Sequence, residues 1–445
     1  MTAQHPLAAS NPLAEQLNAT LAKDCPIALA LLSERGKRFF FPSKGILAQG
    51  AEAKTKATRY NATIGIATDA NGPMHLACVH ESFAASMTPR ECYDYAPSFG
   101  KPELRQAWQK KQREETPSLG GVATSLPVVT NALTHGLSIV GDLFLDPGDE
   151  VLISDHHWEN YELCWETRLG AKLSTFPLFD QRLSGFNQAA FMQALAQRRG
   201  KKLVVALNFP NNPTGYTPTR AEAGAIAEAL KAAAAAGTKI LAVLDDAYYG
   251  MFFDDACERE SLFGRVAGAH ENLLAIKVDG ATKEEFVWGL RVGFLTYAAK
   301  GATPAALTAL EQKTAGFIRA TVSNISQASQ SIVLKALAHP QFRAQQREKV
   351  EILRARAAVT ARECRKADYA GLWDVYPFNS GYFMCLRLKN AVDADRLRLH
   401  LLDQHGLGTI ALGATDLRVA FSCLDESQIA DVFARIAQGA RALAG

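Results

Sequence analysis

The fold is decided by residues 202–250, which read KLVVALNFPNNPTGYTPTRAEAGAIAEALKAAAAAGTKILAVLDDAYYG. An apolar run at 202–207 ends in a loop that holds three Asn and two Pro. An Ala-rich segment at 220–236 has the composition of a helix, and a second apolar run at 239–244 ends at Asp245. A strand, a helix and a strand in this order predict a βαβ unit in a mostly parallel sheet that is covered on both faces.

The same alternation extends from about residue 100 to residue 300. It predicts further strands at 126–129, 150–153, 273–278 and 293–297, and helices at 102–113 and from Leu133 onward. A long helical stretch from 304 to 338 and a second from 340 to 364 lead to a smaller region. That region has predicted strands at 382–388 and 417–421 and a closing helix at 426–443. The sequence therefore predicts an α/β protein with a smaller α+β part.

Composition limits the class of protein. The chain has 445 residues, a formal net charge of +3, 48% hydrophobic and 21% charged residues, which excludes disordered and fibrous proteins. Such a charge balance argues against nucleic acid or a membrane surface as the partner. The eight cysteines form no CxxC pair and have no His at metal-ligand spacing, so we predict no metal site. With neither a signal peptide nor a long apolar segment in view, we expect a cytoplasmic enzyme that acts on small molecules.

Four loops after predicted strands carry unusual residues, and ligands of open α/β sheets bind at the carboxyl ends of strands. Asn208–Gly215 cannot continue a strand or a helix, so it is a fixed turn. Asp245 ends a buried strand, where a carboxylate needs a positive or protonated partner unless it caps the next helix.

The other two loops supply an amine and an anion site. Lys283 follows a buried strand and Arg291 comes eight residues later, which favours a nucleophilic amine near a phosphate over two solvated surface charges. At Thr130–Gly136 a strand turns into a helix, whose free backbone N–H groups could hold a phosphate.

In this order, the four loops resemble those of the pyridoxal-phosphate enzymes of the class I/II aminotransferase family, and most nearly those of aspartate and aromatic aminotransferases. The resemblance covers roughly residues 60–425. It implies the fold type I of pyridoxal-phosphate enzymes, with a seven-stranded, mostly parallel sheet flanked by helices. A large cofactor domain would span 75–350, and a smaller domain would combine 1–74 with 351–445.

The resemblance also implies a role for each matching residue. Lys283 corresponds to the Schiff-base lysine, which also moves the substrate's proton. Asp245 corresponds to the carboxylate that keeps the pyridinium nitrogen protonated. The remaining cofactor contacts are Tyr248 and Asn212 on the ring oxygen, Trp158 on the ring face, and Arg291 with the amides of Ala132 and Leu133 on the phosphate. His156 and His157, which precede Trp158, have no ligand-like partners and are interpreted as loop residues.

Further matches concern the substrate and the partner subunit. Arg418 corresponds to the arginine that binds the substrate's α-carboxylate, and Ile64-Gly65 to a loop that closes over the substrate. Tyr95 and Ser323 would reach the cofactor phosphate of a second copy, and Arg319 a distal carboxylate there. The resemblance thus implies a homodimer with shared active sites and aspartate or glutamate as first choice of amino donor. The acceptor would be a 2-oxo acid such as 2-oxoglutarate.

Several residues depart from the family pattern. Ile325-Ser326 stands where the subgroup has two prolines, Gly280 replaces a serine, and Asn131-Ala132 replaces a turn with glycine. Glu284 and Glu285 put two acids beside the lysine, where they would favour its protonated form. An aromatic or other amino-acid aminotransferase, a lyase or decarboxylase on the same fold, and a transcription regulator with this domain remain alternatives. The N-terminal 45 residues would form either a substrate-closing helix or an arm onto the partner.

Overall fold

The computed structural model of the protein describes residues 12–24, 32, 45–63, 65–69, 72–83 and 87–444. Its largest sheet has seven strands, in the order β4-β10-β9-β8-β7-β5-β6. Along the chain these are β4 (Val128–Asn131), β5 (Glu150–Ser154), β6 (Lys172–Phe176), β7 (Lys202–Asn208), β8 (Lys239–Asp245), β9 (Leu273–Gly280) and β10 (Val292–Ala299). Only β10 runs antiparallel to its neighbours, which confirms the predicted α/β fold with a mostly parallel sheet.

The strands are apolar because helices cover both faces of the sheet. After Lys239 every residue of β8 is buried, as expected for a central parallel strand. The covering helices are α6 (Pro102–Glu115), α7 (Ala132–Phe144), α8 (Gln188–Ala196), α9 (Arg220–Ala235), α10 (Leu262–Val266), α12 (Pro304–Thr321) and α13 (Gln327–Ala338), and α11 (Ala281–Glu284) follows β9 directly. Helix α9 begins with a capping box between Thr219 and Glu222, which ends the preceding loop at a defined residue.

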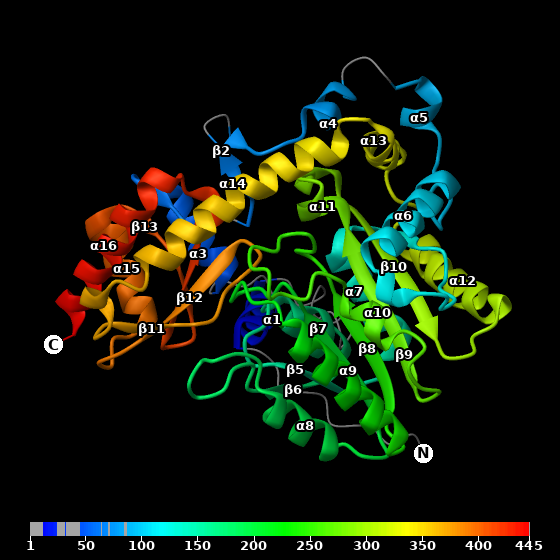
Figure 1. The fold of residues 1–445 in the computed structure, drawn as a ribbon, viewed down its shortest axis with the longest axis horizontal. Helices are drawn as coiled ribbons and strands as arrows, with labels where there is room; N and C mark the ends of the chain where they lie inside the picture. The colour runs from blue at the N-terminus through cyan, green and yellow to red at the C-terminus, as the bar shows by residue number, and fades with distance from the viewer. Residues whose placement is uncertain are drawn as a thin grey trace.

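A second sheet of four antiparallel strands, in the order β11-β12-β15-β14, forms the smaller part of the molecule. Its strands and helices are β11 (Trp373–Val375), β12 (Phe383–Leu388), β14 (Ile410–Leu412), β15 (Asp416–Ala420), α15 (Ala394–His405) and α16 (Glu426–Leu443). Helix α14 (Phe342–Glu363) packs on α16 and runs from there towards α13 (Figure 1).

Segments near the N-terminus join this smaller part. Strand β1 (Tyr60–Asn61) pairs with β13 (Leu407–Gly408), and α3 (Ile46–Lys56) packs against β13 and β14. Figure 1 accordingly shows blue α3 among the orange and red elements. The other early elements are α1 (Pro12–Asp24), β2 (Thr68–Asp69), β3 (Gly72–Pro73), α4 (Ala77–Glu81) and α5 (Pro89–Tyr93). Residues 46–61 therefore pack with the C-terminal elements, while the predicted domains, 75–350 and 1–74 with 351–445, stay a prediction.

Some predicted elements differ from the structure. The helical stretch at 304–338 is two helices, because Ser323 adopts a positive φ of 67° and Ser326 caps α13. Strand β6 was missed because polar residues interrupt its apolar pattern in KLSTF.

Most of the N-terminal 45 residues, and Ile64, lie outside the described residues. None of the described helices is long and apolar enough to cross a membrane.

Gly215 joins the two parts of the molecule where the loop after β7 meets the start of β12. Its carbonyl accepts backbone hydrogen bonds from Asn379 and Ser380, both at 2.9 Å. Its φ is +72°, and a Cβ there would lie 1.9 Å from the carbonyl oxygen of Phe383. Only glycine fits both the backbone conformation and the close approach.

We therefore expect Gly215→Ala to lower the free energy of unfolding by about 3 kcal/mol or more, since it combines a strained φ with a backbone clash. Gly237 is a matched control, because its φ is +96° but a Cβ there meets nothing within 4 Å. Gly237→Ala should cost only about 1 kcal/mol. Urea unfolding of both variants checks this, and equal losses would contradict the close approach at Gly215.

Candidate active site

A cavity of about 420 Å³ opens at the carboxyl ends of the parallel strands, against the smaller sheet. Most of the predicted site residues line it together: Gly65, Ala132, Leu133, Trp158, Asn212, Asp245, Tyr248, Lys283, Arg291 and Arg418. Each of the four predicted loops contributes. The adjacency of β7, β8 and β9 explains this, because neighbouring parallel strands end at the same edge.

Asp245 ends β8 and is 3% exposed. One carboxylate oxygen accepts a hydrogen bond from the hydroxyl of Tyr161, and the other accepts one from the amide of Ala247 at 3.0 Å. Burial raises the pKa of Asp245 to about 6, although the bond from Tyr161 and the nearby Lys283 act in the opposite direction. The site thus holds a buried acid whose charged form calls for a cation in the cavity.

Lys283 lies on α11, one short turn after β9. Its ammonium is 4.8 Å from the centre of the Tyr248 ring. Burial lowers the pKa of Lys283 to about 8, with Asp245 opposing and Arg291 adding to the effect. A lysine of this kind supplies an appreciable fraction of neutral amine near pH 8, which a nucleophile requires.

Another part of the cavity wall offers donors for an anion. Helix α7 begins there with Ala132, whose φ is 61°. As at the start of any helix, its first backbone N–H groups have no partner within the helix. Arg291 also lines this cavity and has a left-handed φ of 55°. Its Nη1 donates a hydrogen bond to the carbonyl of Trp288 at 3.3 Å. Thr282 lines the cavity, and its buried hydroxyl has no hydrogen-bond partner among the described residues.

Arg418 reaches the cavity from β15 in the smaller sheet. Its Nη1 donates to Oδ1 of Asn212 at 3.1 Å, and Nη2 donates to the carbonyl of Thr63 at 3.2 Å. The guanidinium lies 4.2 Å from the centre of the Phe383 ring, while Nε is buried and has no hydrogen-bond partner in the part of the chain that the structure describes. Burial lowers the pKa of Arg418, so this cation also favours an anionic ligand.

Three predicted residues lie apart from this cavity. Tyr95 is 89% exposed, and Arg319 is exposed at the end of α12. Nη1 of Arg319 donates to Oγ of Ser323 at 2.5 Å, and Ser98 donates to the carbonyl of Ser323 at 2.7 Å. Arg319 is thus bonded to Ser323, and Tyr95 lies three residues before Ser98, on the segment that contacts Ser323. Their predicted role was toward a second subunit, and it stays a prediction.

Comparison with known proteins identifies the family. Residues 64–436 match the family model described as aminotransferase class I and II. The chain belongs to this family. It is 27% identical over 227 residues to an aspartate aminotransferase of Musicola paradisiaca, covering 51% of this chain and 52% of that protein. It is 32% identical over 205 residues to an aspartate/prephenate aminotransferase of Thermus thermophilus, covering 45% and 47%. These matches span about half the length of each relative.

Solved structures agree with the aminotransferase fold. A crystal structure of an aminotransferase from Anaerococcus prevotii has a TM-score of 0.79 at 21% identity, covering 92% of this chain and 98% of the other. A kynurenine aminotransferase from Pyrococcus horikoshii has a TM-score of 0.78 at 14% identity, covering 95% and 99%. At these identities the likeness concerns the fold.

The structure also shows cavity-lining residues that the sequence analysis missed. Tyr161 lies one helical turn after Trp158, and that spacing was the available signal. Trp288 and Phe383 add aromatic walls, and no described residue hydrogen-bonds to the buried indole nitrogen of Trp288. Phe383 begins a strand far along the chain, so nothing local indicated its place in the site.

The two acids after Lys283 turn away from the cavity. Glu284 pairs with the ammonium of Lys111, which also lies 2.8 Å from a carboxylate oxygen of Glu115 and 3.5 Å from one of Glu285. Gln346 donates to the Glu284 carbonyl at 3.0 Å and to the Glu285 carboxylate at 2.9 Å. Burial raises the pKa of Glu285 to about 7 and raises the pKa of Glu284 well above its usual range, with Lys111 opposing both shifts. The expectation that these acids act directly on Lys283 is replaced by a role as anchors of its helix.

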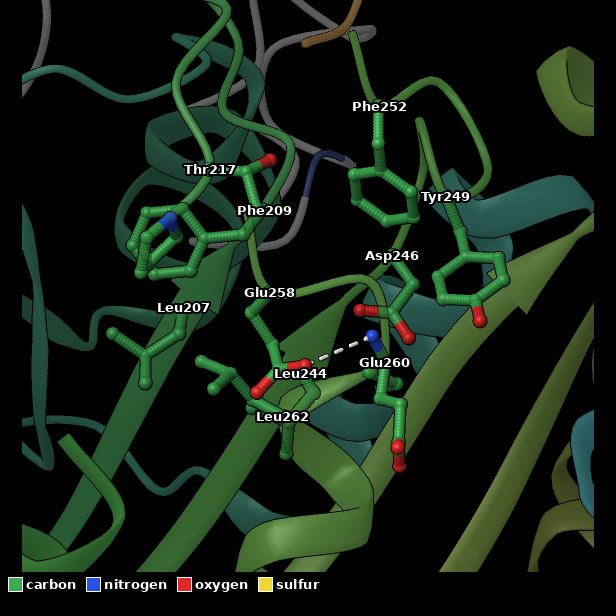
Figure 2. Close-up of a pocket in the computed structure, with 12 residues that line it drawn as sticks. Leu207, Phe209, Thr217, Leu244, Asp246, Tyr249, Phe252, Glu258, Glu260 and Leu262 are labelled. Carbon is green, nitrogen blue, oxygen red and sulfur yellow. Dashed lines mark hydrogen bonds between the residues drawn. The ribbon is translucent and has the colours of Figure 1, made fainter. Parts of the chain in front are cut away.

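Asp246, next to Asp245, faces a different space. It pairs with Lys277, whose ammonium is also 3.7 Å from Asp279. Figure 2 shows Asp246 and Tyr249 beside Glu258 in a second cavity of about 10 Å³, which is room for about one water molecule. Asp245, the last residue of β8, and Asp246, the residue after it, thus line different cavities, and of these two acids only Asp245 lines the candidate site.

We expect Lys111→Met to lower the free energy of unfolding by about 3–5 kcal/mol near neutral pH, because it leaves buried carboxylates without their cation. The loss should shrink below about pH 7, where Glu285 takes up a proton. Lys110→Met is the matched control, since the side chain of Lys110 is 79% exposed and its ammonium lies 3.8 Å from a carboxylate oxygen of Glu114. Urea unfolding should show a change of at most about 1 kcal/mol for this control. Equal effects of the two variants would contradict the anchoring role.

Proposed function

We propose that the protein is a pyridoxal-phosphate-dependent aminotransferase. It moves the amino group of an amino acid, with aspartate or glutamate as first choice, to a 2-oxo acid such as 2-oxoglutarate by a ping-pong mechanism. The observation that carries the proposal is that Lys283, Asp245 and Arg418, from three separate elements, line one cavity. A cytoplasmic location stays a prediction from the sequence.

The residues fit pyridoxal phosphate. The unpartnered hydroxyl of Thr282, the start of α7 and the cation of Arg291 suit a phosphate at one end. The buried carboxylate of Asp245 suits a protonated ring nitrogen, and Trp158 and Tyr248 supply aromatic contacts. When bound, the cofactor provides a ring that takes up the electron pair left at the substrate's Cα.

The chain's own groups then have distinct tasks. Nζ of Lys283 removes the proton from the substrate's Cα, for which its lowered pKa is suited. Asp245 stays ionised opposite a cation and is oriented by Tyr161. Tyr248 keeps its proton, because burial raises its pKa, and so it can donate a hydrogen bond to a ring oxygen.

Arg418 is proposed to bind the substrate's α-carboxylate. Asn212 holds one side of its guanidinium and the carbonyl of Thr63 holds the other. Its partnerless Nε leaves donor capacity for a ligand, and Gly65 at the cavity edge leaves room beside it. A planar, pre-oriented guanidinium discriminates a carboxylate by bidentate hydrogen bonds.

A homodimer with shared sites is proposed from the region around Ser323. Tyr95, Arg319 and Ser323 lie near other exposed apolar side chains, Tyr93 at 85% and Val322 at 46% exposure. Exposed aromatic groups beside an arginine are typical of protein interfaces. In a dimer this surface would bring Arg319 to the partner's cavity.

Two alternatives remain. The cavity walls carry Ile46, Ile66, Trp288 and Phe383, which favour an aromatic or other apolar amino acid as donor. A lyase or decarboxylase could also use the same fold, because the fold does not decide which bond at Cα breaks.

Steady-state kinetics of the holoenzyme with an amino acid and a 2-oxo acid test the reaction class. We expect parallel double-reciprocal lines, because the first product leaves before the second substrate binds. Release of ammonia or carbon dioxide from a single substrate, without need for a 2-oxo acid, would overturn the proposal.

Arg319 decides between the donors. If its guanidinium binds a distal carboxylate, Arg319→Met should raise KM for aspartate and glutamate about 100-fold, as expected for loss of a charged hydrogen-bonded pair. KM for an aromatic amino acid should stay unchanged. Lys313→Met is the control, because Lys313 is an exposed cation on the same helix. Conversion of aromatic but not acidic amino acids, with no effect of Arg319→Met, would refute the first choice.

A further inference from the structure

His156 lies in the loop after β5, two residues before Trp158, and its side chain is 14% exposed. Its Nδ1 is 2.8 Å from Oδ1 of Asp155, and its Nε2 is 3.3 Å from Oδ2 of Asp416. The ring also meets Tyr376 edge-on, at 4.7 Å between ring centres. His156 is therefore held between two carboxylates, and each of its ring nitrogens has a carboxylate oxygen as partner.

The second carboxylate belongs to the strand that carries Arg418. Asp416 and Arg418 are two residues apart on β15, so their side chains leave the same face of the strand. The hydroxyl of Tyr376 lies 3.2 Å from both carboxylate oxygens of Asp416 and holds that side chain in place. A contact at Asp416 thus acts on the orientation of the strand segment from which Arg418 projects.

The backbone of His156 makes a second connection to Arg418. Its carbonyl accepts hydrogen bonds from Ser154 at 2.7 Å and from the side chain of Asn211 at 3.1 Å. The next residue, Asn212, receives Nη1 of Arg418. Three segments distant in sequence, around residues 156, 211 and 416, therefore meet at one histidine.

The histidine is a cation at neutral pH. Burial alone would lower the pKa of His156, but Asp155 and Asp416 outweigh it and raise the pKa to about 9. The other titratable groups near this pair are Tyr376, whose ring lies under the guanidinium of Arg387, and Cys385, which is buried near Asp416. Burial raises the pKa of both Tyr376 and Cys385, so neither adds charge near pH 9.

We propose that His156 is a positioning residue for the substrate. Through its ion pair with Asp416 it fixes the separation between Trp158, at the cofactor ring, and Arg418, at the substrate's carboxylate. The proposal rests on the proposed function. Its consequence is selective: loss of the ion pair misplaces the carboxylate site relative to the ring, while Lys283, Asp245 and Tyr248 keep their own contacts.

The test uses holoenzyme variants His156→Gln, Asp416→Asn and the double variant, with His157→Gln as matched control. The control is apt because His157 lies in the same loop and pairs with Glu162 at 3.3 Å instead. Kd for the donor amino acid is measured from the change in cofactor absorbance in the half-reaction, together with the limiting rate. We expect His156→Gln and Asp416→Asn each to raise Kd about tenfold, with a limiting rate within about threefold of wild type and unchanged cofactor occupancy.

The double variant should be no worse than either single variant, since both remove the same ion pair. Wild-type Kd for 2-oxoglutarate on the aminated holoenzyme should also rise above pH 9, whereas that of His156→Gln should not. This acceptor has no amine of its own to titrate. If His156→Gln fails to fold, Asp416→Asn makes the same pH comparison, because it removes the same ion pair.

Three results would overturn the proposal: unchanged Kd in His156→Gln, effects that add fully in the double variant, or a wild-type Kd that is flat through pH 9. A general loss of cofactor and stability, without a selective effect on Kd, would also overturn it. Failure of the proposed function is distinguishable, because the wild-type enzyme would then convert no amino acid in the half-reaction.

Discussion

The burial of the Asp245 carboxylate at the end of β8 constrains everything around it. Removing such a group from water raises its pKa to about 6, so folding alone disfavours its charge. Only the Tyr161 hydroxyl and the Ala247 amide donate to it among the described residues. The protein therefore keeps a carboxylate whose charged form folding alone does not stabilise. A cation that occupies the cavity stabilises that charge. Functional sites commonly carry such a cost in stability.

The strand order places the other groups of the candidate site next to Asp245. Because β8 lies between β7 and β9, the carboxyl ends of these three strands meet at one edge of the sheet. Asn212, Asp245 and Lys283, which lie at or just after those ends, therefore line the same cavity. The smaller sheet closes that edge with Arg418. Outside the cavity, Lys111 forms an ion pair with Glu284 of α11. Lys277 forms a second buried group with Asp246 and Asp279. Buried ion pairs of this kind are valuable for geometry more than for net stability.

The parts that the sequence predicted well are those governed by local patterns. Apolar runs that end in Asn, Asp or Lys located the parallel strands and their carboxyl ends, and the order of the loops indicated the family. The parts it missed depend on contacts between distant residues. Glu284 meets Lys111 across 173 positions, and His156 meets Asp416 across 260. No periodicity encodes such pairs, so Glu284 was expected to act on Lys283 and His156 was interpreted as a loop residue. His156 does lie in a loop, but its partners give that loop a fixed place.

Chemical trapping tests the central claim, that Lys283 opposite Asp245 is the reactive amine of a pyridoxal-phosphate site. The protein is incubated with pyridoxal phosphate, reduced with borohydride so that the cofactor stays on its lysine, and digested for peptide mass spectrometry. The account predicts one modified peptide, carrying Lys283, in proportion to the protein. Modification spread over exposed lysines, or concentrated on another lysine with Lys283 unmodified, would contradict it.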